Sequence, residues 1–364
     1  MTKSKKSLSE FQLALRQFGN NRMATVCLAV LALLYASAIF ADFLSPYSYD
    51  NEDRNYSFCP PTTIEFLDRG FSRPYVRDVA ITFDQFHKRV YVVDESKKHV
   101  LKLFVQGDEY KLLGFIPLRL HLFGVEGQGR IHIWGADSRG RDLFSRILYG
   151  ARISLSIGLI GVTISFIFGL LVGGIAGYYG GKIDNIVMRI CEMFMMIPGF
   201  YLMLALRAAF PPNLNSLQIY LLIVVIFSFI GWASLARVIR GMSISLRERE
   251  YVLAAKALGH SDISIIIRHI LPHTLSYSLV AVMMSIPGYI LGESALSLLG
   301  LGIQDPYASW GNLLSDAMGI VHVKYAPWIL LPGLFIFMTV MCFNVIGDCL
   351  RDCLDPLLKN EKIV

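Results

Sequence analysis

Six stretches of about 20 mostly apolar residues constrain this chain more than any other feature, because each is long enough to cross a bilayer as a helix. They are Met23–Leu44, Ile153–Tyr178, Ile186–Leu206, Leu217–Ala236, Leu275–Leu299 and Trp328–Gly347. Only 17% of the 364 residues are charged, whereas about a quarter are charged in a soluble domain. The sequence therefore predicts an all-α membrane protein with six transmembrane helices.

The first apolar stretch has a second interpretation, a cleaved signal peptide. Ala36-Ser37-Ala38 resembles a cleavage site after a short apolar run. The charged leader at residues 1–22 is long, however, and the apolar character resumes at Ile39-Phe40-Ala41. We therefore expect an uncleaved transmembrane helix at residues 23–44.

Lysine and arginine gather in three parts of the chain and predict its orientation, because cytoplasmic loops carry an excess of positive charge. These parts are the leader 1–22, the segment 237–274 and the tail 351–364. The segment after the second apolar stretch adds Lys182, with Arg189 just inside the third, whereas the short loops on the other side of the membrane offer only Arg207 and Lys324. We expect both termini to be cytoplasmic. The net charge of +6 is then a topology signal, and nucleic acid is not an expected partner.

Residues 45–135 are predicted to form a β-rich module outside the membrane, between the first two helices. β-branched and aromatic residues alternate there in three runs, Val79–Phe83, Val90–Val93 and Val100–Val105, and polar turns such as Asp94–Lys97 separate them. The alternation implies one buried face. The module either contacts an extracytoplasmic partner or is a solvated addition, and no pocket signature points to cargo binding by the module itself.

An amphipathic helix is expected at residues 138–152, leading into the second transmembrane helix. Leu143, Ile147 and Leu148 share one face. We expect the arginines of this segment to extend toward lipid headgroups: Arg141, Arg146 and Arg152.

Small residues recur at every fourth position of the second helix and indicate close helix–helix packing. The neighbouring helix could belong to this chain or to a partner. The residues are Gly161, Ser165, Gly169, Gly173, Gly177 and Gly181.

Proline–glycine pairs interrupt three of the stretches, at Pro198, Pro287 and Pro332. Proline removes one backbone hydrogen bond and kinks a helix. Transport pathways often use broken helices, and simple packing kinks are about as common, so Pro198 and Pro287 are candidate pathway residues with a structural alternative.

Two carboxylates, Glu192 and Glu293, lie within or near the apolar stretches. Such groups must face protein, water or a partner charge. Glu192 could pair with Arg189 one turn earlier. Glu293 could face a pathway or form a hydrogen bond to a neighbouring helix.

No catalytic constellation is visible in the sequence. A phosphate-binding loop is missing, since Gly180-Gly181-Lys182 is followed by Ile183. The six cysteines are not placed for a structural disulfide, and no metal-ligand cluster has diagnostic spacing. We predict no catalytic residue, no metal and no cofactor, so any ATP must be hydrolysed on another chain.

The cytoplasmic segment 237–274 is the most informative part of the sequence. It is long for a connection between spans and helix-forming, and its small residues Ala254, Ala255 and Gly259 would let a partner surface come close. A solvated amphipathic linker is the alternative.

This segment resembles the EAA loop of ABC import permeases, which reads Glu-Ala-Ala, three residues, Gly, nine residues, Ile-x-Leu-Pro. Leu253 replaces the glutamate and His269 the isoleucine, a departure that concerns one docking contact and not the identity of the loop. The residues that carry the resemblance, including two that precede the motif as in the peptide-importer branch, are Glu250, Tyr251, Ala254, Ala255, Gly259, Leu271 and Pro272.

Three further stretches resemble the second-type (C-type) permease of the oligopeptide/dipeptide branch: residues 135–152, 296–312 and 344–356. The resemblance implies the type I importer permease fold, with a core at residues 136–350 and a short coupling helix that docks on an ATPase subunit. It also implies a bacterial inner membrane and three kinds of partner, a second permease, ATP-binding cassette ATPases and a solute-binding protein. Peptides are the implied cargo, with oligosaccharides or nickel as alternatives. An ion-coupled transporter using Glu192 and Glu293 and a membrane-anchored sensor are the readings from other classes.

Overall fold

The computed structural model describes residues 16–67, 71–83, 85, 89–112, 115–125, 129–211 and 214–354. Most of the expected leader 1–22 and the tail from residue 355 lie outside these ranges. The chain divides into two compact units, one drawn from Met1–Leu31, Ile157–Gly292 and Met338–Val364, the other from Ala32–Ser156 and Glu293–Phe337. We call the first the inner unit and the second the insertion unit.

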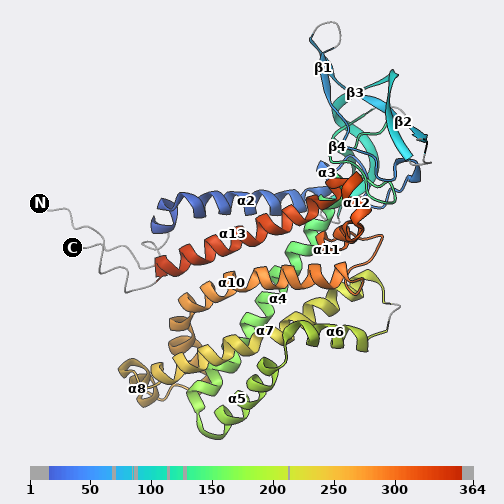
Figure 1. Cartoon of the computed structure of the whole chain (residues 1–364). Coiled ribbons are helices and arrows are strands. Elements are labelled where there is room, and N and C mark those ends of the chain that lie inside the picture. Colours follow the sequence, from blue (N-terminus) through green and yellow to red (C-terminus); the bar gives the residue numbers. More distant parts are fainter. Residues whose placement is uncertain are drawn as a thin grey trace, which may run out of the picture. The chain divides into compact units, whose positions relative to one another are not determined.

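Five helical segments in the described part of the chain are long and apolar enough to cross a membrane, at positions that the sequence predicts. Their names follow Figure 1, in which α2 is blue and α13 red. They are α2 (Arg22–Ile39), α4 (Leu143–Tyr179), α7 (Ser216–Leu246), the segment Asp262–Leu298 that ends in α10 (Leu271–Leu298), and the segment Pro327–Leu354 that contains η4 (Pro327–Leu330) and α13 (Leu331–Leu354).

The expected third span, Ile186–Leu206, differs from the prediction because it is not one straight helix. It consists of α5 (Gly181–Met196) and α6 (Gly199–Ala209), which are bent by 88° relative to each other. The bend lies at Ile197, which is extended (φ −86°, ψ 124°). A residue before proline is driven out of the α region, so Pro198 accounts for the break.

The other two proline–glycine pairs do not break their helices, which corrects the prediction. Pro287 lies inside α10, which continues without interruption to Leu298. Pro332 is in the first turn of α13, where a missing N–H costs no helical hydrogen bond.

Short elements complete the insertion unit. α3 (Ala41–Leu44) follows α2 directly, and η1 (Arg54–Tyr56) lies in the loop that leads to the sheet. The other connections contain α11 (Trp310–Leu313), η3 (Leu314–Met318) and α12 (Ile320–Tyr325).

The predicted β-rich module is present as a four-stranded antiparallel sheet in the order β1-β2-β3-β4. Its strands are β1 (Glu65–Leu67), β2 (Phe71–Phe83), β3 (Arg89–Leu112) and β4 (Ile116–Val125), drawn in blue and cyan in Figure 1. The turn predicted at Asp94–Lys97 is wrong, because β3 runs through it for 24 residues. The pairing register with β2 shifts there, between Arg77 and Asp78, so a bulge absorbs the polar residues.

The single buried face expected for this module is not found on the β2–β3 hairpin. Val92 and Val93 point to opposite faces of β3, and both are 48% exposed. Among the side chains of the four strands that the structure describes, the buried ones are those of Tyr75, Val76, Tyr110 and His121.

Candidate functional site

The segment after α7 contains a two-turn helix, α8 (Glu250–Ala257), and the residues at its two ends explain where it begins and ends. Glu250 lies in the first turn and Lys256 in the last, which suits the helix dipole. The helix terminates where Gly259 adopts φ +81°, with Gly259 N bonded to Lys256 O at 3.0 Å and His260 N to Ala255 O at 3.2 Å. This is a Schellman motif, which needs a residue in the left-handed region. Gly259 therefore ends α8 through its backbone conformation.

One side of α8 packs on its own chain. Val252 and Ala255 are buried against Ile265 and Ile270. Ala255, one of the small residues expected to admit a partner surface, thus belongs to the core of the inner unit. The opposite side is open to a partner.

The open side of α8 is apolar. Leu258 is 80% exposed and Leu253 is 53% exposed, and Tyr251, Ala254 and Ile263 are exposed too. Leu253 is the residue that replaces the family's glutamate, so this face is more apolar than the motif predicts. We call these exposed residues the α8 face: Tyr251, Leu253 and Ala254 of α8, Leu258 directly after it, and Ile263 of the next helix.

The chain then leads from α8 into α10 without a long loop. Ser261 caps α9 (Asp262–Ile265), and Asp262 accepts a hydrogen bond from Tyr178 Oη at 2.7 Å. The π-helical turn η2 (Ile266–Ile270) follows. Pro272 has no backbone N–H to offer this turn, which is where the hydrogen bonding widens from α to π.

Leu271, the motif residue before Pro272, is a core residue. It packs in a buried cluster with Leu170, Ile239 and Ile266. Leu271 and Ala255 thus hold the α8 segment on its own unit, while the α8 face remains exposed.

Polar contacts fix the ends of the neighbouring helices. Arg240 on α7 forms a bidentate ion pair with Asp184 on α5. Arg247 Nη1, just after α7, donates to the carbonyl oxygens of Gly177 (3.3 Å) and Tyr178 (3.5 Å) at the end of α4. These contacts hold the end of α7, from which the α8 segment begins, against α4 and α5.

The small-residue stripe of α4 packs within this chain, which decides between the two partners left open by the sequence. A Cβ on Gly173 would lie 2.5 Å from Ala236 O, and one on Gly177 would lie 2.5 Å from Arg240 O, both on α7. Gly169 faces Leu235, also on α7, and Gly161 faces Tyr289 on α10. Gly181 is different, because nothing lies within 4 Å of its Cβ position.

Glu293 is fully buried in the insertion unit and hydrogen-bonded. Ser297 Oγ donates to its Oε1 at 2.6 Å and Ser154 Oγ, on α4, to its Oε2 at 3.1 Å. Ser154 Oγ also accepts the backbone N–H of Trp310 at 3.1 Å. The sequence left two interpretations of Glu293, a pathway residue or a hydrogen bond to a neighbouring helix. In this conformation Glu293 forms the hydrogen bond to a neighbouring helix.

Glu192 behaves as its sequence context suggests. Arg189 Nη1 donates to Glu192 Oε2 at 3.0 Å on the exposed surface of α5. This ion pair gives the carboxylate of Glu192 a partner charge on its own helix.

The expected extension of Arg141 and Arg146 to lipid headgroups is wrong, because both side chains are buried. Arg141 Nη1 and Arg146 Nη2 donate to Asp305 Oδ1 at 2.7 and 2.9 Å, and Arg141 Nε donates to Asp137 Oδ2 at 2.7 Å. Arg152, also expected at headgroups, pairs instead with Asp42 at 2.6 Å. We call Asp137, Arg141, Arg146 and Asp305 the arginine clamp.

All six cysteines are free and buried. Among the described residues no group of three or more His, Cys, Asp or Glu side chains is placed to hold a metal ion.

Comparison with known proteins decides the family. Residues 169–360 match the model of the binding-protein-dependent transport system inner membrane component, and residues 9–61 match the N-terminal transmembrane domain of oligopeptide transport permease C. The chain belongs to the family of binding-protein-dependent permeases. The resemblance drawn from the coupling loop is thereby confirmed.

Curated relatives of this permease agree with the assignment. The oligopeptide transport system permease proteins OppC of Haemophilus influenzae and Escherichia coli are each 42% identical over 349 residues, or 96% of this chain and 89% and 91% of theirs. The dipeptide transport system permease protein DppC of Bacillus subtilis is 40% identical over 220 residues, covering 60% of this chain and 67% of the relative. A solved amino acid ABC transporter gives a TM-score of 0.41 at 16% identity over 57% of this chain and 93% of that one.

Proposed function

We propose that this permease is the C-type membrane subunit of an ATP-driven peptide importer and forms half of its translocation pathway. Family membership supports the transport role, and the names of the relatives support peptide cargo over oligosaccharides or nickel. The permease hydrolyses no ATP itself in this proposal. It acts with a second permease, ATPase subunits and a solute-binding protein in a bacterial inner membrane.

The α8 face is the observation that carries the mechanism. A short helix with Leu253 exposed and Val252 and Ala255 buried, followed by the exposed side chains of Leu258 and Ile263, is typical of a helix that docks in a groove. Exposed apolar side chains in a charged segment favour a protein partner over lipid. We assign the ATPase subunit to this face.

The proposed orientation follows from the same assignment, with both termini and α8 cytoplasmic and the sheet outside. A thiol probe that cannot cross the membrane should label Phe115→Cys in intact cells and Leu258→Cys only after permeabilisation. The native cysteines give little background, because all six are buried. Labelling of Leu258→Cys in intact cells would overturn the orientation and the docking assignment together.

The docking assignment is tested by Leu258→Asp. Leu258 is so exposed that the change should leave the fold intact, whereas a carboxylate in an apolar docking groove costs at least the ~1.5–3 kcal/mol of a lost leucine contact. We expect peptide-stimulated ATP hydrolysis and uptake to fall by roughly 10-fold or more. Co-purification of the ATPase should weaken in parallel.

Phe115→Asp is the matched control. Phe115 is 86% exposed in the turn before β4, so the same loss of an exposed apolar group occurs far along the chain from α8. It should leave ATPase co-purification unchanged. Normal uptake by the Leu258 variant would remove the coupling role from α8.

A further inference from the structure

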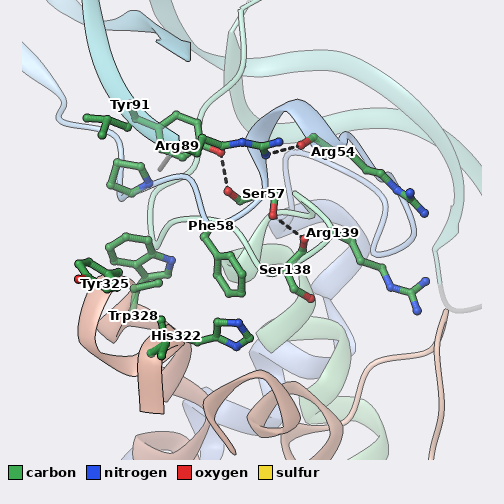
Figure 2. Close-up of a pocket in the computed structure, with 14 residues that line it drawn as sticks. Arg54, Ser57, Phe58, Arg89, Tyr91, Ser138, Arg139, His322, Tyr325 and Trp328 are labelled. Atoms are coloured by element: carbon green, nitrogen blue, oxygen red, sulfur yellow. Dashed lines mark hydrogen bonds between the residues drawn. The ribbon is translucent and has the colours of Figure 1, made fainter. Parts of the chain in front are cut away.

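A cavity of about 860 Å³ lies within the insertion unit, beside the start of β3. Four segments form its walls: the loop at residues 54–60, the start of β3, the turn at residues 138–139, and the segment from α12 to η4. Figure 2 shows Phe58, Trp328 and His322 around one space, with Tyr91 and Arg89 above them. No sequence pattern indicates this cavity, because its walls come from residues up to 274 positions apart, from Arg54 to Trp328.

Hydrogen bonds hold the walls together without a ligand. Ser57 Oγ donates to Ser138 O at 2.6 Å, and Arg89 Nη1 donates to Arg54 O at 2.9 Å, both drawn in Figure 2. Trp328 Nε1 donates to Ala136 O at 3.1 Å. The cavity is therefore preformed, as small-molecule sites usually are.

The floor of the cavity contains a strained residue. Phe58 has φ +55°, which is uncommon for a bulky residue. Its N–H is bonded to Asp137 O at 2.9 Å, and its ring lies 4.8 Å from that of His322. Such strain persists only where the surroundings enforce it, and it clusters at ligand sites.

Arg89 gives the cavity its positive charge. One guanidinium N–H goes to Arg54 O, and the side chain also forms a hydrogen bond with that of Tyr91. Because a guanidinium has five N–H donors, donors are left for an anion. No carboxylate in the described part of the chain forms an ion pair with Arg89. Arg139 at the rim differs, because it is paired with Glu52 and Asp305.

We propose that this cavity is a binding site for short peptides on the permease itself, which rests on the proposed peptide-import function. The C-terminal carboxylate binds the Arg89 guanidinium, for which its bidentate geometry is suited. The last side chain packs among Phe58, Tyr325 and Trp328. The volume lies within the range of about 300–1,000 Å³ that is usual for small ligands.

The test uses the complete transporter in nanodiscs, without its solute-binding protein. The probe is the tripeptide alanyl-alanyl-p-benzoylphenylalanine, whose benzophenone forms covalent adducts on irradiation, and adducts are mapped by mass spectrometry. We expect adducts on residues 54–60 and 321–328. Arg89→Ala should raise the probe concentration needed for half-maximal labelling by roughly 10-fold or more, and the C-terminal amide of the probe should show the same loss.

Arg119→Ala is the matched control, since Arg119 is an exposed arginine of β4 that pairs with Glu109. It should label like the wild type. Arg89→Lys should recover part of the affinity, because it keeps the charge and loses the bidentate geometry.

Three outcomes would decide against the site: no adduct at these residues, adducts that do not depend on Arg89, or cross-linking of the solute-binding protein, and not of the peptide, to a photoreactive residue at position 58. The same nanodisc preparation is also reconstituted into vesicles with the solute-binding protein and ATP. Peptide uptake without labelling of the cavity would refute this inference alone. Loss of uptake with every subunit present would refute the proposed function.

Discussion

Gly173→Ala tests whether α4 and α7 are in backbone contact. The new methyl carbon would lie 2.5 Å from Ala236 O and 2.9 Å from Ile239 Cβ. An oxygen of a helical backbone cannot rotate away as a side chain can, so the two helices must separate. Overpacking of this kind costs about 1–3 kcal/mol, whereas alanine gains about 1 kcal/mol over glycine in helix propensity.

Gly241→Ala on α7 isolates the steric part, because nothing lies within 4 Å of the Cβ position at Gly241. Both variants share the propensity gain, which cancels in the comparison. Because the clash at Gly173 is with backbone, we expect the upper part of the overpacking range, a difference of about 2–3 kcal/mol in the free energy of unfolding.

The assay is SDS-titrated unfolding of the purified permease in mixed micelles, which gives the free energy for each variant. Gly241→Ala should equal or exceed the wild type in stability, and Gly173→Ala should be the least stable of the three. Equal stability of the two variants would show that the helices do not approach this closely, and the reasoning would fail.

Two further predictions concern the insertion unit. Burial alone would raise the pKa of Asp305, but the hydrogen bond from Arg141 and the positive charges of Arg146 and Arg141 outweigh it and lower the pKa. The arginine clamp's contribution to stability is therefore fully present above the unfolded pKa of about 3.9 and is lost as the pH falls through the lower folded value. Asp305→Asn should remove this acid dependence of stability. Hydrogen exchange at residues 137–146, measured between pH 2 and 6, checks this. Glu293→Gln should keep the hydrogen bonds to Ser154 and Ser297 and leave uptake unchanged, whereas Glu293→Ala should cost about 2–3 kcal/mol in thermal unfolding. A stable Gln variant without uptake would contradict the structural role of this carboxyl.

The sequence was sufficient for features that local pattern encodes. Hydropathy predicted six spans, and five of them are helices long and apolar enough to cross a membrane, because a span needs its apolar residues in one continuous stretch. The spacing of small residues on α4 predicted close packing, and the loop motif led to the family. In each of these cases the signal lies within a few dozen residues.

Features that depend on distant residues could not be predicted. Arg146 resembles a headgroup arginine until Asp305, 159 residues later, is seen beside it. The polar run at Asp94–Lys97 has turn composition, and only its pairing with β2 shows that a bulge accommodates it. Ala255 and Ala254 are equivalent in the motif, but the fold buries the first and exposes the second.

The eight residues of α8 are too few for a helix that is stable in isolation, which takes about 12–15. Its order comes from Val252 and Ala255, which rest on Ile265 and Ile270. Ile270 is the last residue before α10 begins. A force applied to the exposed side of α8 is therefore transmitted through this contact to the first residues of α10. Because no long loop separates the two helices, a displacement of α8 also moves the start of α10.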